Sequence, residues 1–115
     1  MFEQWANLDL LELPRVKGLN GYLFSEDNGA NKFGVIVKRG SVNVTLTGTV
    51  KAWIIRPDGE TLEVNGDKSE NRAWVILPEE AYAVPGHISI FIKLINGTEV
   101  STLCAVDAFV CKTTT

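Results

Sequence analysis

A regular recurrence of large aliphatic side chains at every second position between residues 86 and 97 constrains the fold more than any other feature of this 115-residue chain. In the stretch "GHISIFIKLING", a large aliphatic residue stands at every second position from Ile88 to Leu94, while His87 and Lys93 belong to the other set. A period of two places the two sets on opposite faces of a β-strand, whereas a helix repeats every 3.6 residues. The stretch therefore predicts a long strand whose aliphatic face lies in a core.

Other runs rich in valine, isoleucine and aromatic residues are also typical of strands, and turn signals separate them. They are residues 32–39, 41–47, 49–57, 61–64, 71–77 and 99–110. About seven short strands, spaced roughly 8 to 12 residues apart with no interior helix, indicate an all-β sandwich or small barrel.

Two tight turns are expected to close hairpins. In "RPDG", Pro57 suits the first central position, Asp58 tolerates the second, and Gly59 supplies a left-handed residue. In the second turn, Asn96 and Gly97 both tolerate the positive φ of a type I′ turn. We interpret these residues as structural. Between the hairpins, residues 78–86 predict one helical turn that carries the chain from one sheet to the other.

The first twenty residues fit neither period, and Pro14 ends any helix begun before it. We expect residues 1–20 to form an apolar arm or an extra edge strand, residues 21–111 a β-sandwich domain, and residues 112–115 a short tail. An apolar arm is costly to leave in water, so it is expected to pack on its own domain or on a neighbouring subunit. The candidate interface residues are Phe2, Trp5, Leu8 and Leu11.

Charge and hydropathy argue against two classes of partner. The chain carries 11 basic and 14 acidic side chains, and no run of Lys or Arg could neutralise phosphates, so nucleic acid is not an expected partner. No window approaches the roughly 20 apolar residues that cross a bilayer, and the acidic N-terminus lacks the features of a signal peptide. We expect no membrane partner.

The reactive side chains form no recognisable catalytic set. The single histidine, His87, is expected at the surface, and Glu79 and Glu80 are expected to be solvated in a turn. Cys104 and Cys111 share one predicted strand at an odd spacing, which puts them roughly 23 Å apart on opposite faces, too far for a disulfide. No glycine pattern for phosphate and no complete calcium loop occurs. The sequence predicts no catalytic residue, no cofactor and no metal site.

Two tryptophans leave an alternative open. Trp53 and Trp74 lie in "KAWIIR" and "RAWVIL", which admit either register of alternation. We expect both in the core, where each would bury about 150–250 Å². If both were instead exposed on one sheet face, they would form a platform for sugar rings. A carbohydrate-binding or adhesion-type β-sandwich module is therefore the alternative function.

The order of the runs from Phe33 onward is distinctive. It reads "KFGVIVKRG", "VNVTLTG", "VKAWIIRPDGETLEV", "AWVILPEEAYAVPGHISIFIKL" and "TEVSTLCAVDAFV". Over about two thirds of the chain, this order resembles the N-terminal domain of the baseplate upper proteins of tailed phages of Gram-positive bacteria. The most specific pieces are the "RPDG" hairpin and the "ILP" run that leads to "PG" and a long alternating strand.

This resemblance implies an immunoglobulin-like antiparallel β-sandwich of about 7–8 strands, with no catalytic residues. It also implies a structural part of the virion, made in the bacterial cytoplasm, in which copies of the domain oligomerise and help to hold receptor-binding components. The expected partners are further copies of the chain and other phage tail, baseplate or receptor-binding proteins. A small enzyme has the least support.

Overall fold

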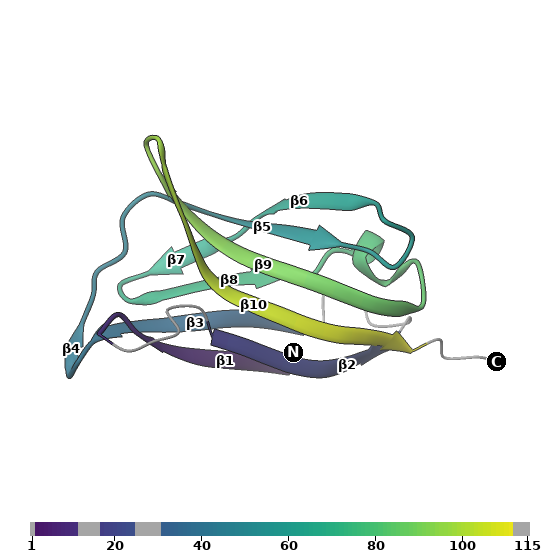
Figure 1. The fold of residues 1–115 in the computed structure, drawn as a ribbon, viewed down its shortest axis with the longest axis horizontal. Coiled ribbons are helices and arrows are strands. Elements are labelled where there is room, and N and C mark those ends of the chain that lie inside the picture. The colour runs from purple at the N-terminus through teal and green to yellow at the C-terminus, as the bar shows by residue number, and fades with distance from the viewer. Residues whose placement is uncertain (1, 12–16, 25–30, 112–115) are drawn as a thin grey trace.

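The structure is a computed structural model that describes residues 2–11, 17–24 and 31–111. Ten strands and one short 3₁₀ helix follow one another along these residues. The strands form two five-stranded sheets that pack face to face (Figure 1). The chain is therefore an all-β sandwich, as the sequence predicts.

The two sheets are called sheet A and sheet B. Sheet A has the order β1-β3-β8-β7, with β4 pairing beside the end of β3. Its strands are β1 (Phe2–Asp9), β3 (Asn31–Arg39), β4 (Val42–Asn43), β7 (Asp67–Ser69) and β8 (Arg72–Ile76). Sheet B has the order β2-β10-β9-β5-β6. Its strands are β2 (Lys17–Phe24), β5 (Thr49–Ile55), β6 (Thr61–Asn65), β9 (Gly86–Asn96) and β10 (Glu99–Cys111).

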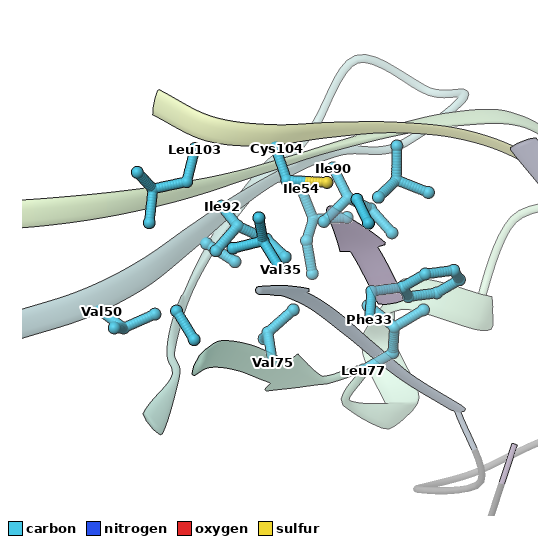
Figure 2. Packing of buried hydrophobic residues seen from close by; sticks show 14 of the residues in the cluster. Phe33, Val35, Val50, Ile54, Val75, Leu77, Ile90, Ile92, Leu103 and Cys104 are labelled. Atoms are coloured by element: carbon cyan, nitrogen blue, oxygen red, sulfur yellow. The ribbon is translucent and has the colours of Figure 1, made fainter. Parts of the chain in front are cut away.

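The core lies between the sheets, and both contribute every second side chain to it (Figure 2). Ile88, Ile90 and Ile92 of β9 are fully buried and Leu94 packs against them, which confirms the alternation in this strand. Phe33 and its aliphatic neighbours on β3 face them from sheet A. Burial of each such side chain is worth about 1.5–3 kcal/mol, so this layer holds the sheets together.

A bulge interrupts the alternation in β10. The register with β9 shifts between Thr102 and Cys104, so Leu103 and Cys104 are consecutive yet both buried (Figure 2). A bulge adds one residue to a strand and bends it, which permits two neighbours to point inward. Leu103 reaches the open end of the sandwich, and Cys104 reaches its centre.

The N-terminal residues supply one edge strand to each sheet. β1 pairs in parallel with β3, the chain crosses to sheet B, and β2 pairs in parallel with β10. Residues 2–9 therefore lie within the sandwich as an edge strand. The fold class is as predicted, but these two pairs are parallel where antiparallel pairing is expected from the sequence. Parallel neighbours need a long crossover connection, which the passage through the other sheet provides.

Two stretches differ from their predicted form. The sequence predicts a strand over residues 41–47, but only Val42–Asn43 pairs with β3, because the chain then leaves for sheet B. The amide of Leu46 donates to the carbonyl of Glu70 (2.8 Å) rather than continuing the ladder. Residues 65–71 are predicted as a turn but contain β7, whose polar residues take strand form because they pair with β8.

The connection between β8 and β9 is as predicted. Residues Glu79–Tyr82 form a single 3₁₀ turn between sheet A and sheet B, and Tyr82 is 3% exposed. Its hydroxyl accepts a hydrogen bond from Asn31 Nδ2 (3.0 Å) in the buried interior. In the described part of the chain, no helix has the length and apolar character needed to cross a membrane.

Candidate functional site

The "RPDG" stretch forms the β5–β6 turn. The amide of Gly59 donates to Arg56 O (3.0 Å), the amide of Arg56 donates to Glu60 O (2.9 Å), and Gly59 has φ 87°. This is a tight turn with Pro57 and Asp58 at its centre and a left-handed glycine after them. Asp58 accepts hydrogen bonds from the Arg56 guanidinium and from the Glu60 amide (3.1 Å). These bonds, that from Arg56 foremost, lower the pKa of Asp58, so its carboxylate serves the turn.

The second turn is displaced by one residue from its predicted position. Asn96 pairs with Glu99 and ends β9, so the loop consists of Gly97 and Thr98. Gly97 has φ 65°, whereas Asn96 and Thr98 are not in the positive-φ region. The prediction of positive φ at Asn96 is wrong, because a positive φ at the first loop position alone is the type II′ pattern. Asn96 Nδ2 instead donates to Thr47 Oγ1 (3.0 Å).

An apolar groove of about 460 Å³ opens at the end of the sandwich that carries the β9–β10 hairpin. Figure 1 shows this hairpin projecting beyond the sheets. We call the groove the end groove. Leu8, Val37 and Leu103 form part of its buried floor. Its rim is polar and includes Thr47 and Asn96. Its size and its apolar lining with a few polar groups are typical of a binding site.

Three exposed apolar residues are neighbours in sequence of residues that line the end groove. Leu11 follows the lining residue Leu10 and is 67% exposed, Val42 is 65% exposed, and Val100 is 56% exposed. The β4 strand and the β9–β10 tip, which carry the last two, project at the same end of the molecule (Figure 1). Exposed apolar groups beside an apolar groove are typical of an interaction surface.

The interface residues proposed from the sequence fall in different places. Leu11 is exposed, but Leu8 is 2% exposed and belongs to the core, so the interface expectation is wrong for Leu8. Trp5 is half-buried on the outer face of sheet A. Phe2 begins β1, and its side chain lies outside the described part of the structure.

The outer face of sheet A carries an aromatic row. Trp5, Gly34 and Trp74 are register partners on β1, β3 and β8. The Trp5 ring lies over Gly34, where an added Cβ would come 2.4 Å from the ring, and meets Trp74 edge-on at 6.1 Å between ring centroids. Lys32 lies over Trp74 and Arg72 over Trp5. Gly34 is the sequence signal that could have predicted this row, because a glycine inside a strand often marks a place where another group approaches the backbone closely.

The outer face of sheet B carries the third tryptophan. Trp53 is half-buried opposite Phe91, and Lys93 Nζ lies 5.0 Å from its ring centroid. The expectation that Trp53 and Trp74 lie in the core is wrong, because Ala52, Ile54, Ala73 and Val75 take the inward positions of their strands. The two tryptophans face outward from different sheets, so they do not form one platform.

Among the residues that the structure describes, His87, Ser89 and Asp107 do not have the arrangement of an activated nucleophile. His87 is exposed, as predicted, and its Nε2 lies 3.0 Å from Asp107 Oδ1. Ser89 Oγ is 3.5 Å from the same oxygen, so the carboxylate bridges the two, whereas in a catalytic triad the histidine stands between serine and acid. Glu79 and Glu80 are exposed on the 3₁₀ turn.

The two cysteines are free and lie on opposite faces of β10. Burial raises the pKa of Cys104 to about 11, so its thiol stays protonated and unreactive at neutral pH. Within residues 2–11, 17–24 and 31–111, no group of three His, Cys, Asp or Glu residues is arranged to hold a metal ion.

No protein-family model and no curated protein sequence matches the chain. Among solved structures, the chain is similar to the N-terminal domain of phage TP901-1 ORF48. The two share 12% sequence identity with a TM-score of 0.57, and the match covers 96% of this chain and 98% of the other. The resemblance expected from the order of the strand runs is thereby confirmed as a likeness of fold with a phage protein domain.

Proposed function

We propose that this chain is a non-enzymatic assembly domain of a phage tail or baseplate. In this role it acts in the virion, oligomerises, and helps to hold receptor-binding components in place. The observation that carries the proposal is the end groove with its exposed apolar neighbours, on a fold similar to that of a phage protein domain over almost its whole length.

The chemistry of the end groove suits a protein partner. Its floor is aliphatic, its rim offers hydroxyl and amide groups, and Glu99 is the charged residue among its lining residues. Interfaces are depleted in charge at their centre and polar at their rim. A large apolar side chain from a neighbouring subunit would fill a cavity of about 460 Å³ together with part of its own loop.

The exposed apolar residues give the proposal a direct test, because replacing them removes contact area without disturbing the core. In Leu11→Ser, Val42→Ser and Val100→Ser, the change falls beside the end groove. The wild-type chain is expected to self-associate at high micromolar concentration in size-exclusion chromatography with light scattering. A triple serine variant is expected to dissociate at the same concentration.

Matched controls are available on the sheet faces. Ile55 and Ile76 are 41% and 39% exposed but lie away from the end groove, so Ile55→Ser and Ile76→Ser should leave self-association unchanged. A wild-type chain that stays monomeric at high micromolar concentration would count against self-assembly. Equal weakening by the control variants would move the interface from the groove to the faces.

A further inference from the structure

A second hollow lies on the outer face of sheet A, where β3 changes its neighbour. β8 pairs with β3 as far as Ile36, and β4 takes over at Lys38. The hollow has a volume of about 500 Å³ and is open to solvent. We call it the polar hollow. It is lined by Asn7, Ile36, Lys38, Asn43 and the four residues from Ser69 to Arg72.

The β7–β8 turn that forms one wall is locally unfavourable. Its two loop residues are Glu70 and Asn71, since Ser69 pairs with Arg72. Glu70 has φ 55°, and it is the non-glycine residue with positive φ among the described residues. Glycine is the usual choice at such a position, and a residue with a Cβ is strained there.

Two hydrogen bonds from residues outside the strained turn hold its backbone. The amide of Leu46 donates to Glu70 O and the amide of Val37 donates to Asn71 O, both at 2.8 Å. These two bonds fix the loop backbone against β3 and the chain that follows β4. Strain of this kind tends to persist where the surroundings enforce it and to cluster at functional sites. The backbone of this wall of the polar hollow is therefore held in place.

Arg72, which follows the β7–β8 turn, is ordered by the aromatic row. The guanidinium carbon of Arg72 lies 5.5 Å from the Trp5 ring centroid. The Trp5 ring packs against Gly34, and its Nε1 donates a hydrogen bond to Glu3 Oε1 (2.9 Å). A guanidinium ordered on an indole loses less freedom when it binds a ligand. Trp5 is thus a positioning residue for Arg72.

The lining groups favour one ligand chemistry. The exposed residues Asn7 and Asn43 offer amides that both donate and accept, which matches the paired hydroxyls of a sugar, whereas Asn71 lines the hollow but is only 8% exposed. Among the lining residues the cations Lys38 and Arg72 outnumber the carboxylate Glu70. Outside the lining, Asp9 is the register partner of Lys38, and Glu3 accepts the hydrogen bond of Trp5. Arginine recognises phosphate and carboxylate groups through paired hydrogen bonds.

We propose that the polar hollow binds an anionic saccharide, a sugar that carries a phosphate or carboxylate group. Arg72 and Lys38 bind the anion, and the asparagine amides with Glu70 bind the hydroxyls. This site lies on a different part of the surface from the end groove and does not depend on the assembly role.

The test is an amide NMR titration of the full chain with three probes: glucose 6-phosphate, glucose and inorganic phosphate. Glucose 6-phosphate is expected to shift the amides of residues 69–72 and of Asn43 saturably, with a Kd on the order of millimolar. Glucose and phosphate are each expected to bind the same residues about tenfold more weakly. Absence of saturable shifts overturns the proposal. Equal affinity for phosphate alone also overturns it, because the hollow would then be a simple anion site.

Two replacements and a matched control separate binding from folding. Arg72→Gln and Lys38→Gln change exposed side chains, and each is expected to weaken glucose 6-phosphate about tenfold while leaving glucose unchanged. Lys93→Gln removes the cation over Trp53 on the other sheet and is expected to change nothing. An equal loss in Lys93→Gln, or no loss in either of the first two, contradicts the assignment of the anion to this hollow.

Discussion

Two hairpin turns of sheet B follow local rules, and two positions of sheet A break them. In sheet B, glycine stands at the positive-φ positions Gly59 and Gly97, and β9 alternates cleanly. In sheet A, glycine stands inside a strand at Gly34, and a glutamate takes a positive φ at Glu70. Each exception in sheet A has a partner far away in the sequence: the Trp5 ring covers Gly34, and Val37 and Leu46 hold the turn of Glu70.

The difference teaches where to look for function. Local and global preferences agree across most of a natural fold, and the exceptions gather at strained or functional sites. Both exceptions of sheet A adjoin the polar hollow, one through Arg72 on the Trp5 ring and the other through Glu70 itself. The comparison between the sheets is open to direct tests.

The largest effect is expected from Gly34→Val. Because even a Cβ would come 2.4 Å from the Trp5 ring, the valine must displace the ring from β3 and break its edge contact with Trp74. Overpacking of this kind costs about 2–3 kcal/mol of unfolding free energy, measurable by urea denaturation. In a Trp5→Ala background the same replacement should cost much less. An equal cost in both backgrounds would show that the ring does not set the requirement for glycine.

Gly59→Val tests the local rule in sheet B. Nothing lies within 4 Å of an added Cβ, so the loss comes from the backbone at φ 87° alone. We expect a loss on the order of 1 kcal/mol or more in unfolding free energy. Gly59→Asn should restore part of it, because asparagine tolerates the left-handed region. A turn that accepts valine as well as asparagine would not have this conformation.

Glu70→Gly should have the opposite sign. Glycine removes the strain at φ 55°, so we expect a gain of about 0.5–1 kcal/mol in unfolding free energy, reduced by the greater flexibility of the unfolded chain. Glu70→Ala is the matched control, since it removes the carboxylate and keeps the Cβ. If alanine stabilises as much as glycine, the charge and not the backbone is the cause.

The lysines that lie over the tryptophans allow the outer faces of the two sheets to be compared directly. Lys32 over Trp74 and Lys93 over Trp53 have similar distances, 5.1 and 5.0 Å, on opposite faces. Replacing either lysine with alanine should cost about 0.5 kcal/mol, and the two costs should match in urea denaturation. A clear difference would show that one face relies on its cation more than the other.

The smallest effect is expected from the Asp58 carboxylate. Arg56 lowers the pKa of Asp58 in the folded chain, so its charge adds stability above the ordinary pKa of about 3.9, and this is lost as the pH falls through the lowered value. The wild type should therefore be slightly more stable than Asp58→Asn at pH 7, with the gap closing toward pH 3. Because the pair is exposed, the gap should also shrink with added salt. A gap independent of pH would assign the effect to the turn hydrogen bond instead.

Some features of sheet B can be predicted from the sequence alone, because they depend on residues that are close together in the chain. The alternation of β9 and the "RPDG" bend each depend on neighbours in the chain. The strand β7 escapes prediction because its residues, Asp67–Ser69, become a strand only by pairing with β8.

The candidate sites escape prediction for a related reason. The polar hollow joins Asn7, Asn43 and Arg72, which are brought together by a parallel edge strand and by the change of partner along β3. Neither the parallel pairing of β1 nor the change of partner along β3 has a signal in the local sequence. The outward direction of Trp53 and Trp74 depends on which of two registers packs better, and the aliphatic neighbours of each tryptophan decide it because they fill the core.

The pairing of β2 with β10 also sets the order in which the domain can be completed during synthesis. Lys17 pairs with Cys104, so the edge of sheet B forms only after nearly the whole domain has been made. At about 5–20 residues per second, the ribosome needs roughly 4–17 s to pass from one to the other. Contacts so distant in sequence form slowly. The strand β2 is therefore among the first to be synthesised and among the last to find its partner, whereas β1 can pair with β3 as soon as residues 31–39 have been made.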